Sequence, residues 1–134
     1  MVAAKRIFAS ICVVVAVLLS NPIFAQCPQY RETAQAPEAV YWQTNPLESS
    51  RHNLRAGKKL FKGKGGKTDC VKCHGKIGEV NGALAKSFAP PPRNRACASM
   101  MSELPDGQLF WVIREGSVNS AMPAHPKLSD EEIW

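Results

Sequence analysis

The chain has 134 residues, 45% of them hydrophobic, and a formal net charge of +6. This length predicts a single domain with one small core. The positive charge is modest, and aromatic residues are not interleaved with the basic ones, so the composition does not indicate a nucleic-acid-binding protein.

The first 25 residues have the features of a signal peptide. A basic pair at residues 5–6 precedes an apolar run over 11–19, and residues 23–25 offer a cleavage site. The apolar run is too short to cross a bilayer comfortably, which favours a cleaved signal and export to the periplasm or an equivalent compartment. An uncleaved N-terminal anchor and a lipid anchor on Cys27 are the alternatives. Removal of this segment leaves a formal charge of +4, because it contains two basic and no acidic residues.

Residues 26–50 are predicted to form an extended arm. They contain Pro28, Pro37 and Pro46, with polar residues between short apolar ones. This composition is typical of irregular backbone rather than of a helix or a strand. We expect the arm to lie against a domain formed by residues 51–134.

The first helix is predicted to begin near Ser50. Leu54, Gly57 and Phe61 follow at spacings of three and four, which places them on one face, and a glycine-rich stretch from Gly63 ends the helix. Glycines over residues 75–82 then predict a flexible loop, and residues 84–88 a short helical turn. The three prolines at 90–92 exclude regular structure.

Two further helix starts follow in the last third of the chain. Asp106 is expected to cap a helix that Gly116 ends. Ser129 and Glu132 have the spacing of a capping box, which predicts another helix start close to Trp134. No alternating strand pattern of useful length is present, so the sequence predicts a small, loop-rich, all-α domain.

The residues that indicate chemistry are Cys70-Val71-Lys72-Cys73-His74. A C-x-x-C-H arrangement is typical of c-type haem attachment. Two thiols three residues apart can reach the two vinyl groups at one porphyrin edge, and the adjacent imidazole can bind the iron. We therefore expect one covalent haem c per chain, held by Cys70 and Cys73, with His74 as an axial ligand.

Two other kinds of site use a similar cysteine pair. A structural zinc site needs a second pair of ligands, for which His125 and Cys97 are poor substitutes. A thioredoxin-like dithiol follows a strand within a βαβ unit, and the sequence does not predict one. Zinc binding and dithiol chemistry are kept as the weaker alternatives.

The remaining cysteines predict a disulfide bond. Cys12 lies in the signal segment, which leaves Cys27 and Cys97 outside the motif. Two such cysteines in an exported protein are expected to pair.

Several segments resemble the class I cytochromes c. Residues 56–61 are similar to the N-terminal helix of that family, and residues 73–75 to its haem attachment site. Residues 106–116 resemble a family helix, residues 120–123 (Ser-Ala-Met-Pro) its methionine-ligand loop, and residues 128–134 the opening of its C-terminal helix. The resemblance covers residues 54–134 and implies a cytochrome c-like fold of a few helices and long loops around one haem.

The resemblance also implies the second axial ligand. The Met-Pro pair makes Met122 the expected iron ligand, while Met100, Met101 and His125 remain alternatives. It further implies that backbone around the three prolines orients the His74 ring. Three other residues are weaker candidates for contacts with haem propionates: Arg93, Asn94 and Trp111.

A haem iron with both axial positions filled transfers electrons but binds no substrate. The sequence therefore predicts a one-electron carrier rather than an enzyme. A gas sensor or peroxidase with a displaceable ligand, and an electron-transfer subunit of a larger oxidoreductase, are the alternatives. Seven lysines lie near the motif: Lys58, Lys59, Lys62, Lys64, Lys67, Lys72 and Lys76. If these lysines form a basic ring, acidic redox partners are expected. The alternative is that the lysines form only a solvated face.

The end of the sequence carries one more expectation. A helix start at Ser129 needs a helix to follow, so we expect the C-terminal helix to be truncated at Trp134. In the resembling family this helix crosses the first one, here at Gly57 and Phe61. A naturally short variant, in which the N-terminal arm covers that face, is the alternative.

Overall fold

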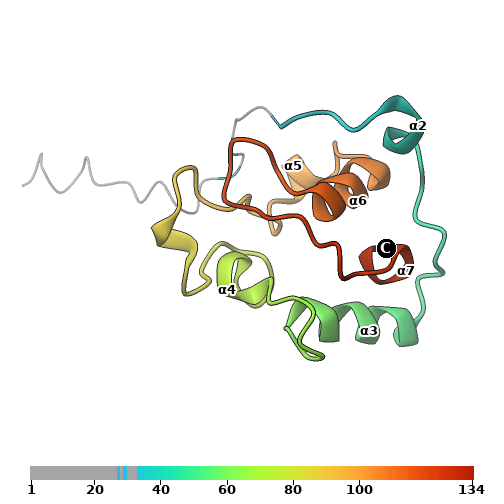
Figure 1. The fold of residues 1–134 in the computed structure, drawn as a ribbon, viewed down its shortest axis with the longest axis horizontal. Helices are drawn as coiled ribbons and strands as arrows, with labels where there is room; N and C mark the ends of the chain where they lie inside the picture. Colours follow the sequence, from blue (N-terminus) through green and yellow to red (C-terminus); the bar gives the residue numbers. More distant parts are fainter. Residues whose placement is uncertain (1–26, 28, 30–32) are drawn as a thin grey trace, which may run out of the picture.

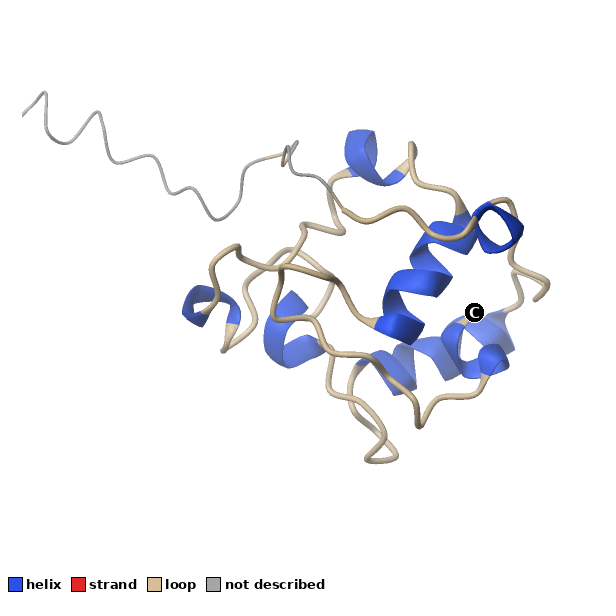
Figure 2. Ribbon diagram, turned by 45° about the horizontal axis from the view of Figure 1, so that its top comes forward, coloured by secondary structure: helices blue, strands red, loops and turns tan. Residues whose placement is uncertain are grey.

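The computed structural model describes Cys27, Gln29 and residues 33–134, so the predicted signal peptide lies outside the described residues. These residues form helices joined by long loops, without a strand, which confirms the all-α class (Figures 1 and 2). None of the helices described is long and apolar enough to cross a membrane. The elements are α2 (Glu38–Tyr41), α3 (Arg51–Phe61), α4 (Val71–His74), the 3-10 helix η2 (Ala85–Ser87), α5 (Ala98–Met101), α6 (Asp106–Glu115) and α7 (Asp130–Ile133).

Helix α3 begins and ends where the sequence predicts. The Ser50 hydroxyl accepts a hydrogen bond of 3.1 Å from the backbone N–H of Asn53, which satisfies one of the free donors of the first turn. The helix ends before Gly63, whose φ of 73° suits glycine. The apolar face of α3 is only partly covered, because no residue of the helix is buried and Leu54 is 64% exposed.

Helix α6 begins differently from the prediction. Asp106 is not the capping residue: Pro105 precedes the helix in extended conformation and Asp106 is its first residue. The Asp106 carboxylate accepts a hydrogen bond of 3.1 Å from the backbone N–H of Asn45, so the arm uses this oxygen instead of the helix. The predicted stop at Gly116, with a φ of 82°, is confirmed.

Helix α7 carries the predicted capping box. The Ser129 hydroxyl accepts from the backbone N–H of Glu132, and the Glu132 carboxylate accepts from the backbone N–H of Ser129. Trp134, directly after α7, stacks on Phe110 of α6 with ring centroids 4.4 Å apart. Helix α7 contacts both α3 and α6, and a Cβ atom on Gly57 of α3 would meet nothing within 4 Å.

The N-terminal arm lies against the domain, as expected, but its backbone is not extended throughout. Residues Glu38–Tyr41 form the single turn α2, in which the Pro37 carbonyl accepts from the N–H groups of Val40 and Tyr41. The expectation failed here because the fixed φ of proline suits the start of a helix as well as an extended chain.

Close packing of α2 on α6 depends on Gly107. A Cβ atom at this position would collide with the carbonyl oxygen of Val40. The N–H of Gly107 also donates to the carbonyl of Gln43 at 2.9 Å. The arm and α6 therefore make direct backbone contact, and Figure 1 shows α2 beside α6 at the edge of the fold.

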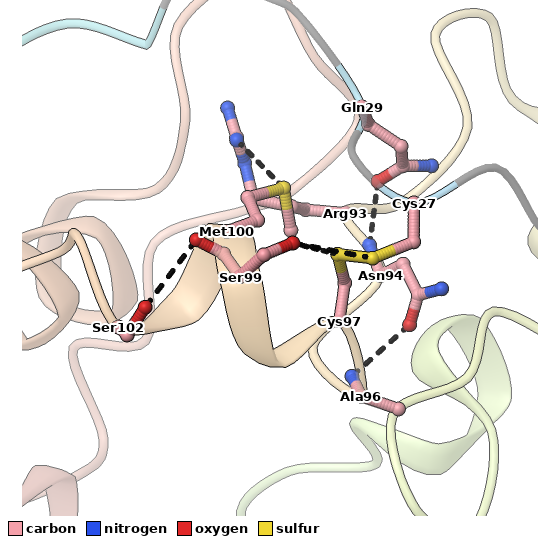
Figure 3. Close-up of a disulfide and its surroundings, with 9 residues drawn as sticks. All are labelled: Cys27, Gln29, Arg93, Asn94, Ala96, Cys97, Ser99, Met100 and Ser102. Atoms are coloured by element: carbon pink, nitrogen blue, oxygen red, sulfur yellow. Dashed lines mark hydrogen bonds between the residues drawn. A yellow bond between two sulfur atoms is a disulfide. The ribbon is translucent and has the colours of Figure 1, made fainter.

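The start of the arm is fastened by the predicted disulfide. Cys27 and Cys97 are bonded, with Cα atoms 5.6 Å apart and a sequence separation of 70. Cys97 lies directly before α5, a helix that the sequence analysis did not predict. Figure 3 shows the bond beside Ser99 and Asn94, with Gln29 of the arm reaching the same segment.

Candidate functional site

The C-x-x-C-H residues are wound on a single helical turn. The carbonyl of Cys70 accepts hydrogen bonds from the N–H groups of Cys73, at 3.2 Å, and His74, at 2.8 Å. Both motif cysteines are free thiols, and both are half-buried. The structure thus brings Cys70, Cys73 and His74 together on α4 and the residue before it, as the motif predicts.

The loop after α4 closes over the end of this turn. The carbonyl of His74 accepts from the N–H of Val80 at 2.9 Å, and that of Lys72 accepts from the N–H of Leu84 at 2.8 Å. A Cβ atom on Gly82 would collide with the Lys72 carbonyl. The glycines of this loop, predicted to give flexibility, therefore allow close backbone approach. The carbonyl groups at the end of α4 gain partners from the loop, which holds the motif in its helical conformation.

The environment of Cys73 favours the neutral thiol. Partial burial raises the pKa of Cys73 above its ordinary value, and the nearby charges of a Cys70 thiolate and of Asp69 raise it further. A catalytic or redox-active thiol needs a lowered pKa. The preceding segment is moreover a loop rather than a strand. Both observations disfavour a thioredoxin-like dithiol.

A zinc site is also disfavoured. Structural zinc takes four ligands in a tetrahedron. Among Cys27, Gln29 and residues 33–134, no three His, Cys, Asp or Glu side chains are grouped so as to hold a metal ion.

The expected second ligand lies on a different part of the chain. Met122 is half-buried in the loop between α6 and α7. Its N–H donates to the Ser120 hydroxyl at 3.2 Å, and its carbonyl accepts from the N–H of Ser117 at 3.1 Å. His125 lies on the same loop, is also half-buried, and donates its N–H to the Arg114 carbonyl at 3.2 Å.

The two alternative methionines belong to α5. Met100 is buried, and its sulfur accepts a hydrogen bond of 3.3 Å from Nη1 of Arg93 (Figure 3). This thioether is therefore engaged within the protein. Met101, next in the helix, is half-buried.

Two of the residues considered for contacts with haem propionates, Arg93 and Asn94, form hydrogen bonds with the N-terminal arm. Arg93 donates from Nη2 to the hydroxyl of Thr33 at 2.6 Å. The buried Asn94 donates its backbone N–H to Oε1 of Gln29 at 2.6 Å. Their contacts explain how Gln29 and Thr33 of the arm are attached. The third candidate, Trp111, is half-buried in α6.

The lysines near the motif are not all free cations. Lys67 forms an ion pair with Glu132 at 2.6 Å, and Lys72 pairs with Asp69 at 2.9 Å. Hydrogen bonding to Asp69 and its charge raise the pKa of Lys72. The positive potential of this region is therefore weaker than the count of seven lysines implies.

A groove of about 760 Å³ lies between the arm, α3 and α7, away from the motif. Its lining includes Leu47, Leu54, Gly57, Leu60 and Trp134 and none of the C-x-x-C-H residues. The exposed His52 of α3 also lines this groove.

A small all-α fold with C-x-x-C-H on one helical turn defines a c-type cytochrome domain of class I type. The family model described as cytochrome c oxidase, cbb3-type, subunit III matches residues 52–134, and the chain belongs to this family. The domain binds haem c covalently and serves haem-based electron transfer.

One solved structure supports the fold. The chain is similar to a protein of the reducing HAO-like protein complex from Kuenenia stuttgartiensis, with a TM-score of 0.52 and 24% identity. The match covers 67% of this chain and 43% of that one, so this chain spans less than half of its neighbour's length. No curated protein matches the sequence significantly.

The residues present fit a covalent haem. Two free thiols and an imidazole are the donors that haem c needs, in the required order along the chain. The protein's own core is small, since no large side chain among the described residues is less than 2% exposed. A porphyrin adds a large apolar area to such a core.

Proposed function

We propose that this protein is an exported monohaem c-type cytochrome that carries single electrons between redox partners. Cys70 and Cys73 would hold haem c through thioether bonds, and His74 and Met122 would bind its iron. The observation that carries the proposal is the placement of two free thiols and the imidazole on one helical turn. Haem c supplies an iron that gains and loses one electron.

The protein supplies attachment and ligands rather than a catalytic group. The loop from Gly75 to Leu84 bonds to the carbonyls of Lys72 and His74 and so fixes the turn that presents the imidazole. A methionine thioether opposite histidine favours ferrous iron and raises the reduction potential. If His74 and Met122 both bound the iron, no substrate would reach it, and the protein would act as an electron carrier rather than an enzyme.

Met122 is preferred over its competitors for two reasons. It stands in a Ser-Ala-Met-Pro sequence similar to the methionine-ligand loop of class I cytochromes c. The sulfur of Met100, by contrast, accepts a hydrogen bond from Arg93. His125, three residues further on, is the alternative that experiment has to exclude.

Export is supported from two directions. Residues 1–25 have the pattern of a signal peptide. The Cys27–Cys97 bond also agrees with an oxidising compartment, because disulfides persist mainly outside the cytosol.

The central test is haem attachment. Holo-protein treated with acid and organic solvent should keep its haem, whereas Cys70→Ser combined with Cys73→Ser should release it. Lys72→Ser, between the two cysteines, is the matched control and should remain coloured. Haem extracted from the wild-type protein would refute the proposal, and rapid carbon monoxide binding by the ferrous protein would favour a gas sensor or peroxidase.

The partners are proposed to be acidic redox proteins. Lys62, at the end of α3, is exposed, and no ion pair forms with it among the described residues. Lys62→Glu should slow electron transfer to an acidic acceptor and weaken the dependence on salt, since exposed charges are screened within about 8 Å at physiological ionic strength. Lys72→Glu should act less strongly, because Asp69 already offsets its charge. Rates that do not vary with salt would contradict acidic partners.

A second candidate is an electron-transfer subunit of a larger oxidoreductase. The family description, which names an oxidase subunit, favours it. Sedimentation of the protein purified under mild conditions from its own host separates the two possibilities. A carrier sediments as a free monomer, whereas a subunit remains in a complex of fixed stoichiometry.

A further inference from the structure

Helix α3 carries a row of cations on one face. Arg51, Arg55 and Lys59 are spaced by four residues, and Lys62 follows Lys59 by three, so the four side chains lie on one side of the helix and its end. All four residues are exposed, and no ion pair forms with any of them among the described residues. From Arg51 to Lys59 this α3 cationic row is about 12 Å long.

Acidic residues do not offset the α3 cationic row. The sequence contains none between Glu48 and Asp69. Three acidic residues, Glu48, Glu131 and Glu132, line the groove between the arm, α3 and α7, but none of the four cations of the row lines it. The row therefore lies outside the groove and keeps its full positive charge.

An exposed apolar side chain borders the row. Leu54 is 64% exposed, and as a residue three positions after Arg51 and four before Lys58 it is a neighbour of both on the helix surface. Helices with a cationic face and apolar side chains beside it are typical of segments that lie at a membrane surface. Long basic side chains suit this position, because their aliphatic stems contact apolar surface while their charges stay in water.

Two features favour a lipid surface over an acidic protein as the partner. Specific protein interfaces have an apolar centre from which lysine is depleted, whereas this row has charges at its centre and its apolar residue at the border. A straight row on an outer helix also presents all its charges together to a flat surface, and Figure 1 shows α3 along one edge of the fold. Anionic phospholipid head groups form such a surface and attract basic side chains.

We propose that the α3 cationic row docks this protein on the surface of a bilayer that contains anionic phospholipids. The contact is peripheral: the four cations lie against the head groups, and Leu54 adds a shallow apolar contact at the border. The inference concerns where the protein is held, so it goes beyond the proposed electron transfer and does not depend on the assignment of the iron ligands.

Flotation of the purified holo-protein with vesicles of phosphatidylcholine, with and without phosphatidylglycerol, tests the inference. The wild type should bind only the vesicles with phosphatidylglycerol and should dissociate as salt is raised, since exposed charges are then screened. The triple variant Arg51→Gln with Arg55→Gln and Lys59→Gln should bind about 100-fold more weakly, because each basic residue near an anionic surface strengthens binding about fivefold. Lys62, which the proposed docking of redox proteins uses, is left unchanged.

The matched control removes three exposed cations outside α3. The variant Lys76→Gln with Lys86→Gln and Lys127→Gln has the same net charge as the α3 triple variant, and none of these lysines forms an ion pair among the described residues. It should keep most of the wild-type binding. Arg51→Lys with Arg55→Lys keeps the charge and should bind vesicles like the wild type, whereas a protein that recognises the planar guanidinium would bind it less well.

Three results would overturn the inference. Equal losses in the two glutamine variants would mean that only net charge matters. Equal binding to neutral vesicles, unaffected by salt, would indicate an apolar anchor. Absence of binding to phosphatidylglycerol vesicles would exclude a lipid partner, and slower electron transfer from the α3 triple variant to an acidic protein would then assign the row to a protein partner. Circular dichroism checks folding, and Lys59→Gln alone, expected to weaken binding about fivefold, replaces the triple variant if that variant does not fold.

Discussion

The backbone N–H of Ala36 donates a hydrogen bond of 2.8 Å to Oε1 of Gln108, 72 residues away in sequence, and both residues are buried. The Nε2 of the same side chain donates to the carbonyl of Ala34 at 3.0 Å. One glutamine side chain in α6 thus bonds to a backbone N–H and to a backbone carbonyl of the irregular arm. Buried backbone groups need such partners, so Gln108 makes the arm part of the domain.

Replacement of Gln108 should destabilise the folded protein. Gln108→Ala leaves the N–H of Ala36 buried without an acceptor, which we expect to lower the free energy of unfolding by about 1–3 kcal/mol. Urea denaturation followed by circular dichroism measures the change. The control is Gln43→Ala, whose side chain makes only an exposed bond to Ala39 and should matter little. Equal stability of the two variants would show that the arm detaches freely.

Two helical glycines should respond oppositely to alanine. Gly107→Ala forces a Cβ atom into the carbonyl of Val40, which is backbone and cannot rotate away, so we expect a loss of about 1–3 kcal/mol. Gly57→Ala meets nothing within 4 Å and should stabilise α3 by up to about 1 kcal/mol. Thermal denaturation of both holo-proteins tests the pair. A loss in Gly57→Ala would reveal a close contact on α3.

Removal of the Cys27–Cys97 disulfide should cost about 4 kcal/mol, from the loop-closure entropy of a crosslink between residues 70 apart. The double variant Cys27→Ser with Cys97→Ser is compared with wild type by guanidinium denaturation without reductant. Haem attachment should survive, because Cys70 and Cys73 are separate thiols. A free thiol at either position in the exported wild type, detected by peptide mass mapping, would contradict the bond.

The assignment of Met122 as a ligand predicts a spectroscopic loss. Met122→Ala should abolish the weak near-red absorption that a sulfur ligand gives to ferric haem and should allow carbon monoxide to bind the ferrous form. His125→Ala, on the same loop, should do neither. The opposite result would assign the ligand to His125, and persistence of the band in both variants would assign it to Met100 or Met101.

The capping box of α7 predicts a dependence of stability on pH. Hydrogen bonds from Lys67, and then from the Ser129 backbone, lower the pKa of Glu132. The Glu132 carboxylate therefore binds a proton more weakly in the folded state than in the unfolded state. Its contribution to the stability of the folded protein is fully present above the unfolded-state pKa of about 4.3, and it is lost as the pH falls through the lower folded-state pKa.

The test compares Glu132→Gln with wild type by denaturation at pH 7 and at pH 3. The variant should be less stable at pH 7 and should lose less stability on acidification. Glu131→Gln, one residue earlier on α7, is the control. If both variants have the same acid response as wild type, the Lys67–Glu132 pair contributes nothing to stability.

Features that depend on neighbouring residues along the chain are predicted correctly from the sequence. The C-x-x-C-H spacing predicts the helical turn that carries Cys70, Cys73 and His74. Local capping groups at Ser50 and Ser129 identify the starts of α3 and α7. Such signals succeed because the groups that stabilise a helix end lie within four residues of it.

Contacts between residues that are far apart in the sequence depend on the folded structure. Asp106 is of a residue type that often caps helices, yet its carboxylate accepts a hydrogen bond from the backbone N–H of Asn45, 61 residues away. Trp134 stacks on Phe110 of α6. Gly107 and Gln108 match no motif in the sequence, but both contact the N-terminal arm in the folded protein. These contacts join segments that have little regular secondary structure, so no periodic pattern in the sequence predicts them. The partners come within reach of each other only when the backbone is folded.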